Sequence, residues 1–561
     1  MNAWIEPILF LFFIITLTPL LGELYARVLR GDRVPVLSFL RPVENWIYHI
    51  SGIDPHREMR WKEYVFCVLG FSAVGIVFLT VLQLVQYKLP LNPQGIGSVP
   101  LLLAINTAVS FVTNTNWQAY SGETTLSYAV QALGLTVQNF VSAATGIAVM
   151  AALARGVTRK KTAEMGNFGA DLVRSTLYIL LPLAVIVAVL LVGQGVVQNF
   201  THNVDVQTIQ GTTQSLPMGL AASQIAIKQL GTNGGGFFGV NSAHPFENPT
   251  PFSNFIECFS ILLLPSVLAY TFGVLVNKRR HGIALLAAMF TIFLFCTGVA
   301  MWAELQGNPA LGGLPFMEGK EVRIGVIPSV LWGSSTTLAS NGSVNSMHDS
   351  FSPLAGGVAI FNMLLGEVVF GGVGSGTYGM VLFVVLTVFI AGLMVGRTPE
   401  YLGKKIEARD VLLAVIGVLL PSAAVLIFSA ISLVTSSGLA SLSNAGPHGL
   451  SEILYAFASP ANNNGSAFAG LNALTPHYTI LTSIAMLIGR FGVIIPVMAL
   501  AGSLSGKKYT PPSVGTFPTE GYLFVILLIA VVIIVGALTF FPALTLGPVM
   551  EHFLMLNGRT F

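Results

Sequence analysis

Ten long apolar runs dominate the pattern of hydrophobic and polar positions along this chain. Each is close to, or longer than, the roughly 20 residues that an α-helix needs to cross the hydrocarbon core of a bilayer. The runs cover residues 4–22, 64–87, 125–153, 172–197, 252–276, 282–302, 358–395, 411–436, 478–503 and 522–545. The pattern predicts an all-α integral membrane protein with ten transmembrane helices.

Four shorter apolar segments lie between these runs and are too short to cross a membrane. They cover residues 97–112, 217–231, 328–339 and 449–461. Apolar segments of about this length are more often re-entrant than spanning. We therefore expect four short helices that enter the membrane and turn back.

A polar motif built around asparagine and a small residue closes each short segment. The candidate metal-binding residues are Thr113, Asn114, Thr115, Asn116, Thr232, Asn233, Gly234, Ser340, Asn341, Gly342, Asn463, Asn464 and Gly465. Within them, Asn114, Asn233, Asn341 and Asn464 lie 119, 108 and 123 residues apart. A lone Asn-Gly pair is typical of a surface turn, but four motifs in the same context indicate one module used four times.

The module defines the predicted organisation of the chain. Its repeats are expected at residues 64–155, 172–281, 282–396 and 411–508. A first transmembrane helix with a cytoplasmic loop precedes them at 1–63, and a last helix with an outer tail follows at 520–561. The predicted fold is therefore four pseudo-symmetric helix–pore loop–helix repeats around a central selectivity filter.

A ring of four such loops can replace the water shell of a potassium ion with backbone carbonyl oxygens. Successive carbonyls point the same way if residues alternate between right-handed and left-handed backbone, and glycine escapes the left-handed penalty of roughly 1–2 kcal/mol. Gly234, Gly342 and Gly465 share one slot in three repeats, and Thr115 is expected in that slot, with local strain, in the first. The carboxyl ends of the short helices would add partial negative charge. One dominant dehydrated site suits a slow, coupled transporter better than a fast channel.

Composition and charge support the membrane assignment and orient the chain. Hydrophobic residues make up 53% and charged residues 9%, against about 25% charged in soluble domains. Of the 27 Lys and Arg residues, 21 lie in the segments 22–63, 153–174, 277–281, 396–410 and 503–520. The positive-inside rule places these segments in the cytoplasm and both termini outside. The basic residues near the first run follow it, which favours a retained span over a signal peptide.

Three carboxylates follow the motifs: Glu123, Glu247 and Asp349. A negatively charged outer mouth would concentrate cations. The alternative is ordinary solvated loop charge.

Two ionisable residues in apolar runs are candidates for the ion pathway. Glu367 precedes a glycine-rich break at 371–376, and Arg490 lies within the ninth run. Such residues are costly at membrane depth and should face the bundle interior. Glu367 could attract the ion below the filter, Arg490 could block a leak, and Gly372 and Gly374 could belong to a gate; the alternative is that Glu367 and Arg490 form a structural pair. Gln118 either lines the mouth of the first loop or braces it with a hydrogen bond.

The sequence shows no motif for ATP chemistry. Residues 374–379 match G-x-G-x-x-G but lie inside an apolar run with no strand before them, and residues 501–508 lack the spacing of a phosphate loop. We therefore expect no bound nucleotide, a non-catalytic chain, and an ATP-hydrolysing partner if transport is active.

Longer motifs resemble a known family. They are Thr-Asn-Trp-Gln (115–118), Ser-Gly-Glu-Thr-Thr-Leu-Ser-Tyr (121–128), Leu-Thr-Val-Gln-Asn-Phe (135–140), Gly-Thr-Asn-Gly-Gly-Gly-Phe-Phe (231–238), His-Pro-Phe-Glu-Asn-Pro (244–249), Met-His-Asp-Ser-Phe (347–351), the run 366–376 and the run 396–405. Together they resemble the potassium-binding A subunit of the Kdp potassium-transporting ATPase, over nearly the whole length.

The resemblance implies a potassium-capturing subunit in a bacterial inner-membrane complex, with potassium as the transported substrate. It implies three partners: a P-type ATPase B subunit that receives the ion, a C subunit, and a small single-span F subunit. The family's first loop also reads Thr-Asn-Trp-Gln. The alternative function is a stand-alone potassium channel or cation-coupled transporter of the same architecture.

Overall fold

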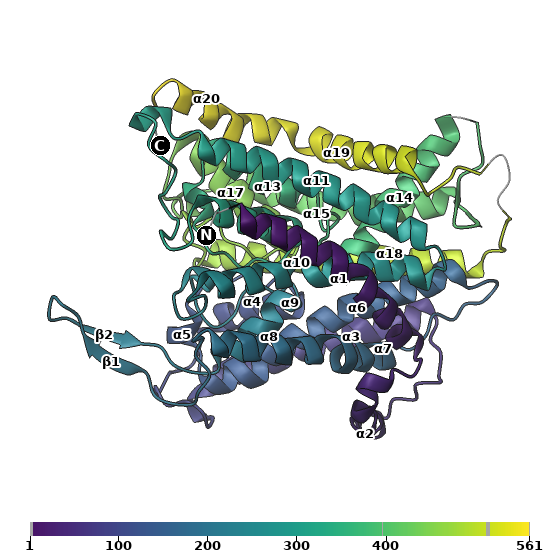
Figure 1. Cartoon of the computed structure of the whole chain (residues 1–561), viewed down its shortest axis with the longest axis horizontal. Coiled ribbons are helices and arrows are strands. Elements are labelled where there is room, and N and C mark those ends of the chain that lie inside the picture. Colours follow the sequence, from purple (N-terminus) through teal and green to yellow (C-terminus); the bar gives the residue numbers. More distant parts are fainter. Residues whose placement is uncertain (1–3, 395, 512–515, 560–561) are drawn as a thin grey trace.

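The computed structural model describes residues 4–394, 396–511 and 516–559, and most of these residues are helical (Figure 1). The α-helices are α1 (Ile5–Arg30), α2 (Arg41–Ser51), α3 (Trp61–Leu84), α4 (Leu101–Val112), α5 (Gly122–Thr125), α6 (Val137–Thr158), α7 (Phe168–Arg174), α8 (Leu181–Gly193), α9 (Ala221–Leu230), α10 (Pro251–Leu275), α11 (Arg279–Leu305), α12 (Val326–Leu338), α13 (Pro353–Leu364), α14 (Ser375–Met394), α15 (Ala408–Val434), α16 (Ser436–Leu439), α17 (Gly446–Ala461), α18 (Pro476–Gly506), α19 (Tyr522–Leu544) and α20 (Met550–Leu556). Stretches of π-helix occupy Val130–Thr136, Ser175–Leu180 and Thr545–Val549. Short 3-10 helices cover Pro35–Leu40, Gln86–Lys88, Asn241–Ala243, Pro309–Leu311 and His348–Ser350.

The predicted spans agree with the structure. Ten helical segments of the described chain are long and apolar enough to cross a membrane: Ile5–Arg30, Trp61–Leu84, Val130–Thr158, Phe168–Gly193, Pro251–Leu275, Arg279–Leu305, Ser375–Met394, Ala408–Val434, Pro476–Gly506 and Tyr522–Leu556. The seventh predicted run divides into α13 and α14, and only α14 is long enough to span. Its break covers residues 365–374 and not the expected 371–376, because α13 ends at Leu364 and α14 begins at Ser375.

Local sequence signals set several helix ends. The side chain of Thr250 accepts a hydrogen bond from Ser253 N and Pro251 takes the first helical position of α10, where its missing N–H costs nothing. Thr475 and Pro476 begin α18 in the same way. At the other end of a helix, Gly31 stops α1 with a φ of 82°.

Burial separates inner helices from outer ones. The spans differ in the buried share of their most apolar stretch. This share is 83% in the spans containing α6 and α10 and 78% in α14, but 22% in α1 and α3. The outer helices present exposed apolar side chains such as Phe12, Phe66 and Val74, as expected of surfaces that contact lipid. Helices α6, α10 and α14 are therefore the inner helices that surround the centre of the bundle.

The two ends of the helical bundle differ. Figure 1 shows both chain ends on the side that carries α5 and the antiparallel hairpin β1 (Val204–Gln207) and β2 (Thr213–Leu216), in which Val204 pairs with Leu216. Helix α2 lies at the opposite side. A second, short hairpin joins β3 (Glu400–Tyr401) and β4 (Lys404–Lys405).

Candidate functional site

The four short apolar segments are helices, as predicted, and each delivers a buried loop. Helices α4, α9, α12 and α17 are followed by loop 1 (113–117), loop 2 (231–235), loop 3 (339–343) and loop 4 (462–466). Within these loops the predicted metal-binding residues are all buried. The carboxyl ends of the helices, with their partial negative charge, thus lie directly beside the loops.

Backbone hydrogen bonds show which residues of the four loops correspond. Thr115, Asn233, Asn341 and Asn464 each donate an N–H to the carbonyl oxygen five residues earlier, at 2.8–3.1 Å. The following N–H, on Asn116, Gly234, Gly342 and Gly465, returns to the residue six positions earlier: to the carbonyl oxygens of Ser110 and Lys228 and to the hydroxyl oxygens of Thr336 and Ser459. The loops are therefore one structural motif repeated four times.

This register corrects the expectation for the first loop. Asn116, and not Thr115, occupies the slot of Gly234, Gly342 and Gly465, and the expected strain at Thr115 is wrong. The reason is local: α4 ends at Val112, so that Thr113 caps it as Gly231, Ala339 and Asn462 cap the other three helices. Counting asparagines along the sequence therefore displaces the first loop by one residue.

Left-handed backbone recurs at two positions in every loop. The first is Asn114, Thr232, Ser340 and Asn463, with φ of 66°, 47°, 47° and 46°. The second is Asn116, Gly234, Gly342 and Gly465, with φ of 55°, 86°, 99° and 95°. One right-handed or extended residue separates the two, which is the alternation that points successive carbonyls the same way. Asparagine is the non-glycine residue that tolerates this geometry best.

The loops contact one another in a closed ring. A Cβ on Gly234 would overlap Asn341 O, one on Gly342 would overlap Asn464 O, and one on Gly465 would overlap Thr115 O. Between loops 1 and 2, the Asn114 amide donates to Gly231 O at 3.2 Å and to Thr232 O at 3.1 Å. Only glycine leaves room for these approaches at the three glycine positions. The backbones of neighbouring loops are therefore in direct contact.

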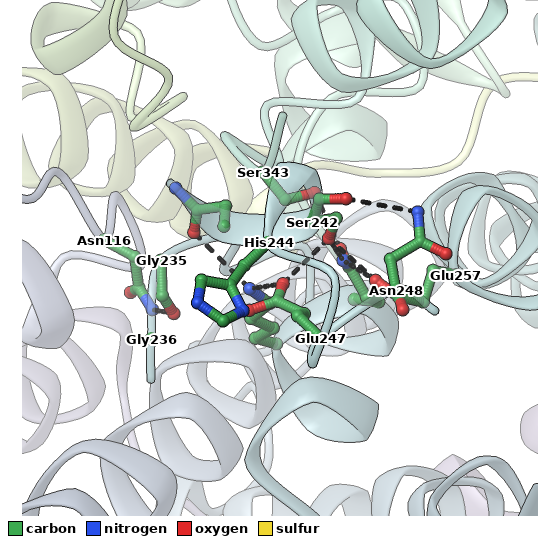
Figure 2. Close-up of polar contacts among 12 residues, drawn as sticks. Asn116, Gly235, Gly236, Ser242, His244, Glu247, Asn248, Glu257 and Ser343 are labelled. Atoms are coloured by element: carbon green, nitrogen blue, oxygen red, sulfur yellow. Dashed lines mark hydrogen bonds and ion pairs between the residues drawn. The ribbon is translucent and has the colours of Figure 1, made fainter. Parts of the chain in front are cut away.

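A polar network that the sequence analysis missed supports loops 2 and 3 (Figure 2). Lys228 in α9 forms a fully buried ion pair with Glu247. Ser242 Oγ lies 2.8 Å from Glu247 Oε1 and 2.7 Å from Glu257 Oε2. The Ser343 hydroxyl donates to the Gln229 side chain at 2.9 Å, which links the network to loop 3. The sequence held one signal for this network: a lysine within a short apolar segment, where a charge needs a buried partner.

The three outer carboxylates contact specific partners and do not form the open, negatively charged mouth that was one of the two expectations. Glu247 is in the buried pair above, and Glu123 accepts a hydrogen bond from Gly239 N at 2.9 Å. Asp349 lies 2.9 Å from His448 Nε2. Each carboxylate is therefore engaged by a specific partner, because the outer loops fold back onto the bundle.

Gln118 braces two loops. Its amide nitrogen donates to Gly236 O at 2.9 Å, and its amide oxygen accepts from Gly236 N at 3.1 Å. It also borders a hollow of about 300 Å³ shared with Glu452 and Phe468. Both expected roles, bracing the first loop and lining its mouth, fit this position.

Arg490 lies in the bundle interior, as predicted. It is 2% exposed, and its Nη2 donates to Ser142 O in α6 at 2.8 Å. One residue before it, Gly489 packs against Ala461 O at the end of α17. The guanidinium therefore extends from α18 towards α6, near Ser142 and Gly146.

The break between α13 and α14 packs against the ring. Val373 N donates to Thr232 Oγ1 at 2.8 Å, and Gly371 N donates to Leu338 O at 3.0 Å. Gly374, with a φ of 82°, has no room for a Cβ against Gly146 O. Irregular backbone is tolerated at membrane depth only where protein or a cavity surrounds it, and here it packs against loop 2 and the end of α12.

Glu367 lies within this break, and its Oε1 and Thr232 Oγ1 of loop 2 both lie near Gly372. Ser375 Oγ donates to Glu367 Oε1 at 2.9 Å. Glu367 borders a cavity of about 40 Å³ that Asn462 and Gly489 also line. Among the described residues, Glu367 and Arg490 do not form an ion pair within 4.0 Å, so the geometry does not favour a direct structural pair.

Comparison with known proteins decides the family. The family model described as potassium-transporting ATPase A subunit matches residues 8–553. The chain belongs to this family. A potassium-transporting ATPase potassium-binding subunit from Leptospira interrogans (strain Fiocruz L1-130) is 54% identical over all of both chains. One from Sorangium cellulosum is 56% identical over 98% of each chain. The resemblance drawn from the sequence motifs is confirmed.

A solved structure supports the fold. The potassium transporter TrkH from Vibrio parahaemolyticus matches 88% of this chain and 98% of its own, with a TM-score of 0.54 and 15% identity. At this identity the likeness shows the architecture alone. That architecture agrees with the predicted helix–pore loop–helix repeats.

Proposed function

We propose that this chain is the potassium-binding and translocating subunit of an ATP-driven potassium uptake complex. It captures external potassium in the ring of loops 1–4 and passes the ion to a P-type ATPase partner. One observation carries the proposal: four loops at the ends of four short helices present the same pair of left-handed positions. The names of the family and of its relatives support the same function.

The ring suits potassium because that ion sheds water only where several oxygens replace the shell. The metal-binding residues proposed above supply those oxygens chiefly from their backbone, since most of their side-chain amides and hydroxyls are engaged in hydrogen bonds with the loops and the neighbouring helices. Asn341, for example, donates its amide to Lys228 O at 3.2 Å, and Asn464 donates to Thr336 O at 2.7 Å. Side chains thus hold the loops, and carbonyls face the ion.

The ion leaves the ring past the break between α13 and α14. Glu367 attracts it on the cavity side, and Arg490 repels it from a direct route to the cytoplasm. Gly372 and Gly374 give the break the backbone that a gate needs. Gln118 braces the outer entrance.

The partners are a P-type ATPase B subunit, a C subunit and a small single-span F subunit. The complex lies in the bacterial inner membrane with both termini of this chain on the periplasmic side. The positive-inside distribution of Lys and Arg supports this orientation.

Reconstitution tests the proposal. The full chain in liposomes should neither hydrolyse ATP nor accumulate potassium until a P-type ATPase partner is added. The matched control is the same complex with Gly342→Ala, which should lose uptake while the partner remains present. ATP hydrolysis by the pure chain contradicts the proposal, and rapid passive potassium flux through the chain alone supports the stand-alone channel instead.

A further inference from the structure

A cluster of metal-ligating side chains lies outside the ring, at the start of α17. His448 and Glu452 are one helical turn apart, and Asp349 comes from the 3-10 turn that follows loop 3. One ligand atom from each of the three lies within 4.8 Å of the other two. His448 Nε2 is 2.9 Å from Asp349 Oδ1.

A fourth group orients the histidine. Nδ1 of His448 lies 2.7 Å from Glu551 Oε1 in α20. A carboxylate on the second ring nitrogen is the arrangement that fixes the tautomer and direction of a metal-ligating histidine. Nε2 is thereby aimed at Asp349.

The charges in this cluster do not balance. Asp349, Glu452 and Glu551 bring three carboxylates to one imidazole, and among the described residues no Lys or Arg forms an ion pair with them. With His448 protonated and all three carboxylates ionised, two negative charges remain unbalanced. Buried carboxylates without a compensating cation are costly, so the site is complementary to a divalent ion.

Gly470 keeps the space between the carboxylates open. Its φ is 46°, and a Cβ there would lie 2.6 Å from Glu452 Oε1 and 2.8 Å from Asp349 Oδ1. Both oxygens therefore border the same small volume. Any side chain at this position would fill it.

We propose that Asp349, His448 and Glu452 bind a divalent first-row transition metal ion, for which Zn²⁺ is the probe. One imidazole nitrogen and two carboxylate oxygens are a donor set typical of zinc, whereas calcium and magnesium take oxygen ligands alone. On binding, the ion replaces the proton that His448 Nε2 shares with Asp349, and that proton passes to solvent.

The ion would join three segments of the outer face. Asp349 follows loop 3, His448 and Glu452 begin the helix that ends at loop 4, and α20 supplies Glu551. The His448 ring also stacks on Phe468, with centroids 5.8 Å apart. Asp349 N donates to Phe468 O at 2.8 Å, so the metal site and the segment after loop 4 are already in contact.

Titration of the full chain, purified in detergent after treatment with a chelator, tests the site. Isothermal titration with Zn²⁺ should give one ion per chain, and X-ray absorption should show one nitrogen of histidine with oxygen ligands at about 2.0–2.2 Å. His448→Gln and Asp349→Asn should each weaken binding by about tenfold or more. His202→Gln, at an exposed histidine outside the cluster, is the matched control and should bind as the unaltered chain does.

The two cluster variants remove different ligands: His448→Gln removes the imidazole, and Asp349→Asn removes a carboxylate. If His448→Gln does not fold, Asp349→Asn keeps the imidazole and still reports on the site, and the stoichiometry of the unaltered chain needs neither variant. Absence of Zn²⁺ binding, equal binding by both cluster variants and the control, or binding of Ca²⁺ in preference to Zn²⁺ overturns the proposal.

Discussion

At the scale of single residues, the left-handed positions of the four loops carry the proposed potassium site. Glycine serves three of the second positions and Asn116 the fourth, so the ring is chemically asymmetric although its hydrogen bonds repeat. Unlike glycine, Asn116 has a side chain, and its amide donates to Asn139 Oδ1 at 2.7 Å and to Gly235 O at 3.0 Å. A glycine there would free the backbone and lose both contacts.

Alanine at Gly234, Gly342 or Gly465 should weaken potassium binding by about tenfold or more. The left-handed penalty alone is roughly 1–2 kcal/mol, and about 1.4 kcal/mol is a tenfold change in affinity. The added Cβ would also displace a carbonyl of the neighbouring loop. Titration of the purified variants with K⁺, Rb⁺ and Na⁺ measures both affinity and selectivity.

Gly298→Ala is the matched control, because a Cβ at that position of α11 meets nothing within 4 Å. It should bind potassium as the unaltered chain does. Unchanged affinity and selectivity in all three loop variants would rule out the glycine positions as part of the site.

At the scale of elements, the division of one predicted span into α13 and α14 places irregular backbone against the ring. The break is anchored to loop 2 through Val373 and to the end of α12 through Gly371. Glu367 lies within the break and borders a cavity, and Arg490 contacts α6. The break therefore contacts loop 2 and the end of α12 directly, which is the contact that the proposed gate requires.

Arg490→Met should uncouple ATP hydrolysis from potassium transport or lower potassium affinity. Two like charges 4 Å apart repel by about 4 kcal/mol at an effective dielectric constant near 20, and this barrier is lost with the guanidinium. Glu367→Gln should impair transport less. Parallel assays of ATPase rate and potassium uptake by the reconstituted complex measure the ratio.

Arg490→Lys separates charge from hydrogen bonding, since lysine keeps the positive charge but cannot reproduce the guanidinium geometry. It should retain more coupling than Arg490→Met. If Arg490→Met prevents assembly and any complex that survives works normally, the residue has a structural role and no part in the barrier.

At the scale of the whole molecule, the two ends of the helical bundle are different. Both chain ends and the β1–β2 hairpin lie at one end, and α2 lies at the other (Figure 1). The strongly basic segments that contain α2 and the β3–β4 hairpin are expected in the cytoplasm. Loops 1–4 would then receive potassium from outside.

Cysteine labelling in spheroplasts should report this orientation. After replacement of Cys67, Cys258 and Cys296, Thr212→Cys in the β1–β2 turn should react with a membrane-impermeant thiol reagent in intact spheroplasts. Lys405→Cys, in the β3–β4 hairpin, should react only after permeabilisation. The reverse pattern would place the termini in the cytoplasm.

The sequence by itself determined the features that depend on neighbouring residues. Ten spans and four short helices follow from the length of apolar runs, because a bilayer imposes that length on any helix that crosses it. The left-handed backbone at Gly234, Gly342 and Gly465 follows from the chemistry of glycine within one motif. Arg490 in the interior follows from the cost of a charge in lipid.

Only the tertiary structure decided what depends on distant segments. The first loop is offset by one residue from the asparagine count, because the end of α4 and contacts with loop 2 set its register. Lys228 and Lys320 are buried against Glu247 and Glu304, since paired charges can be enclosed where single ones cannot. Even Asn341 finds its acceptor, Lys228 O, 113 residues earlier in the chain. No local pattern encodes such a pairing, because it exists only once the repeats have closed into a ring.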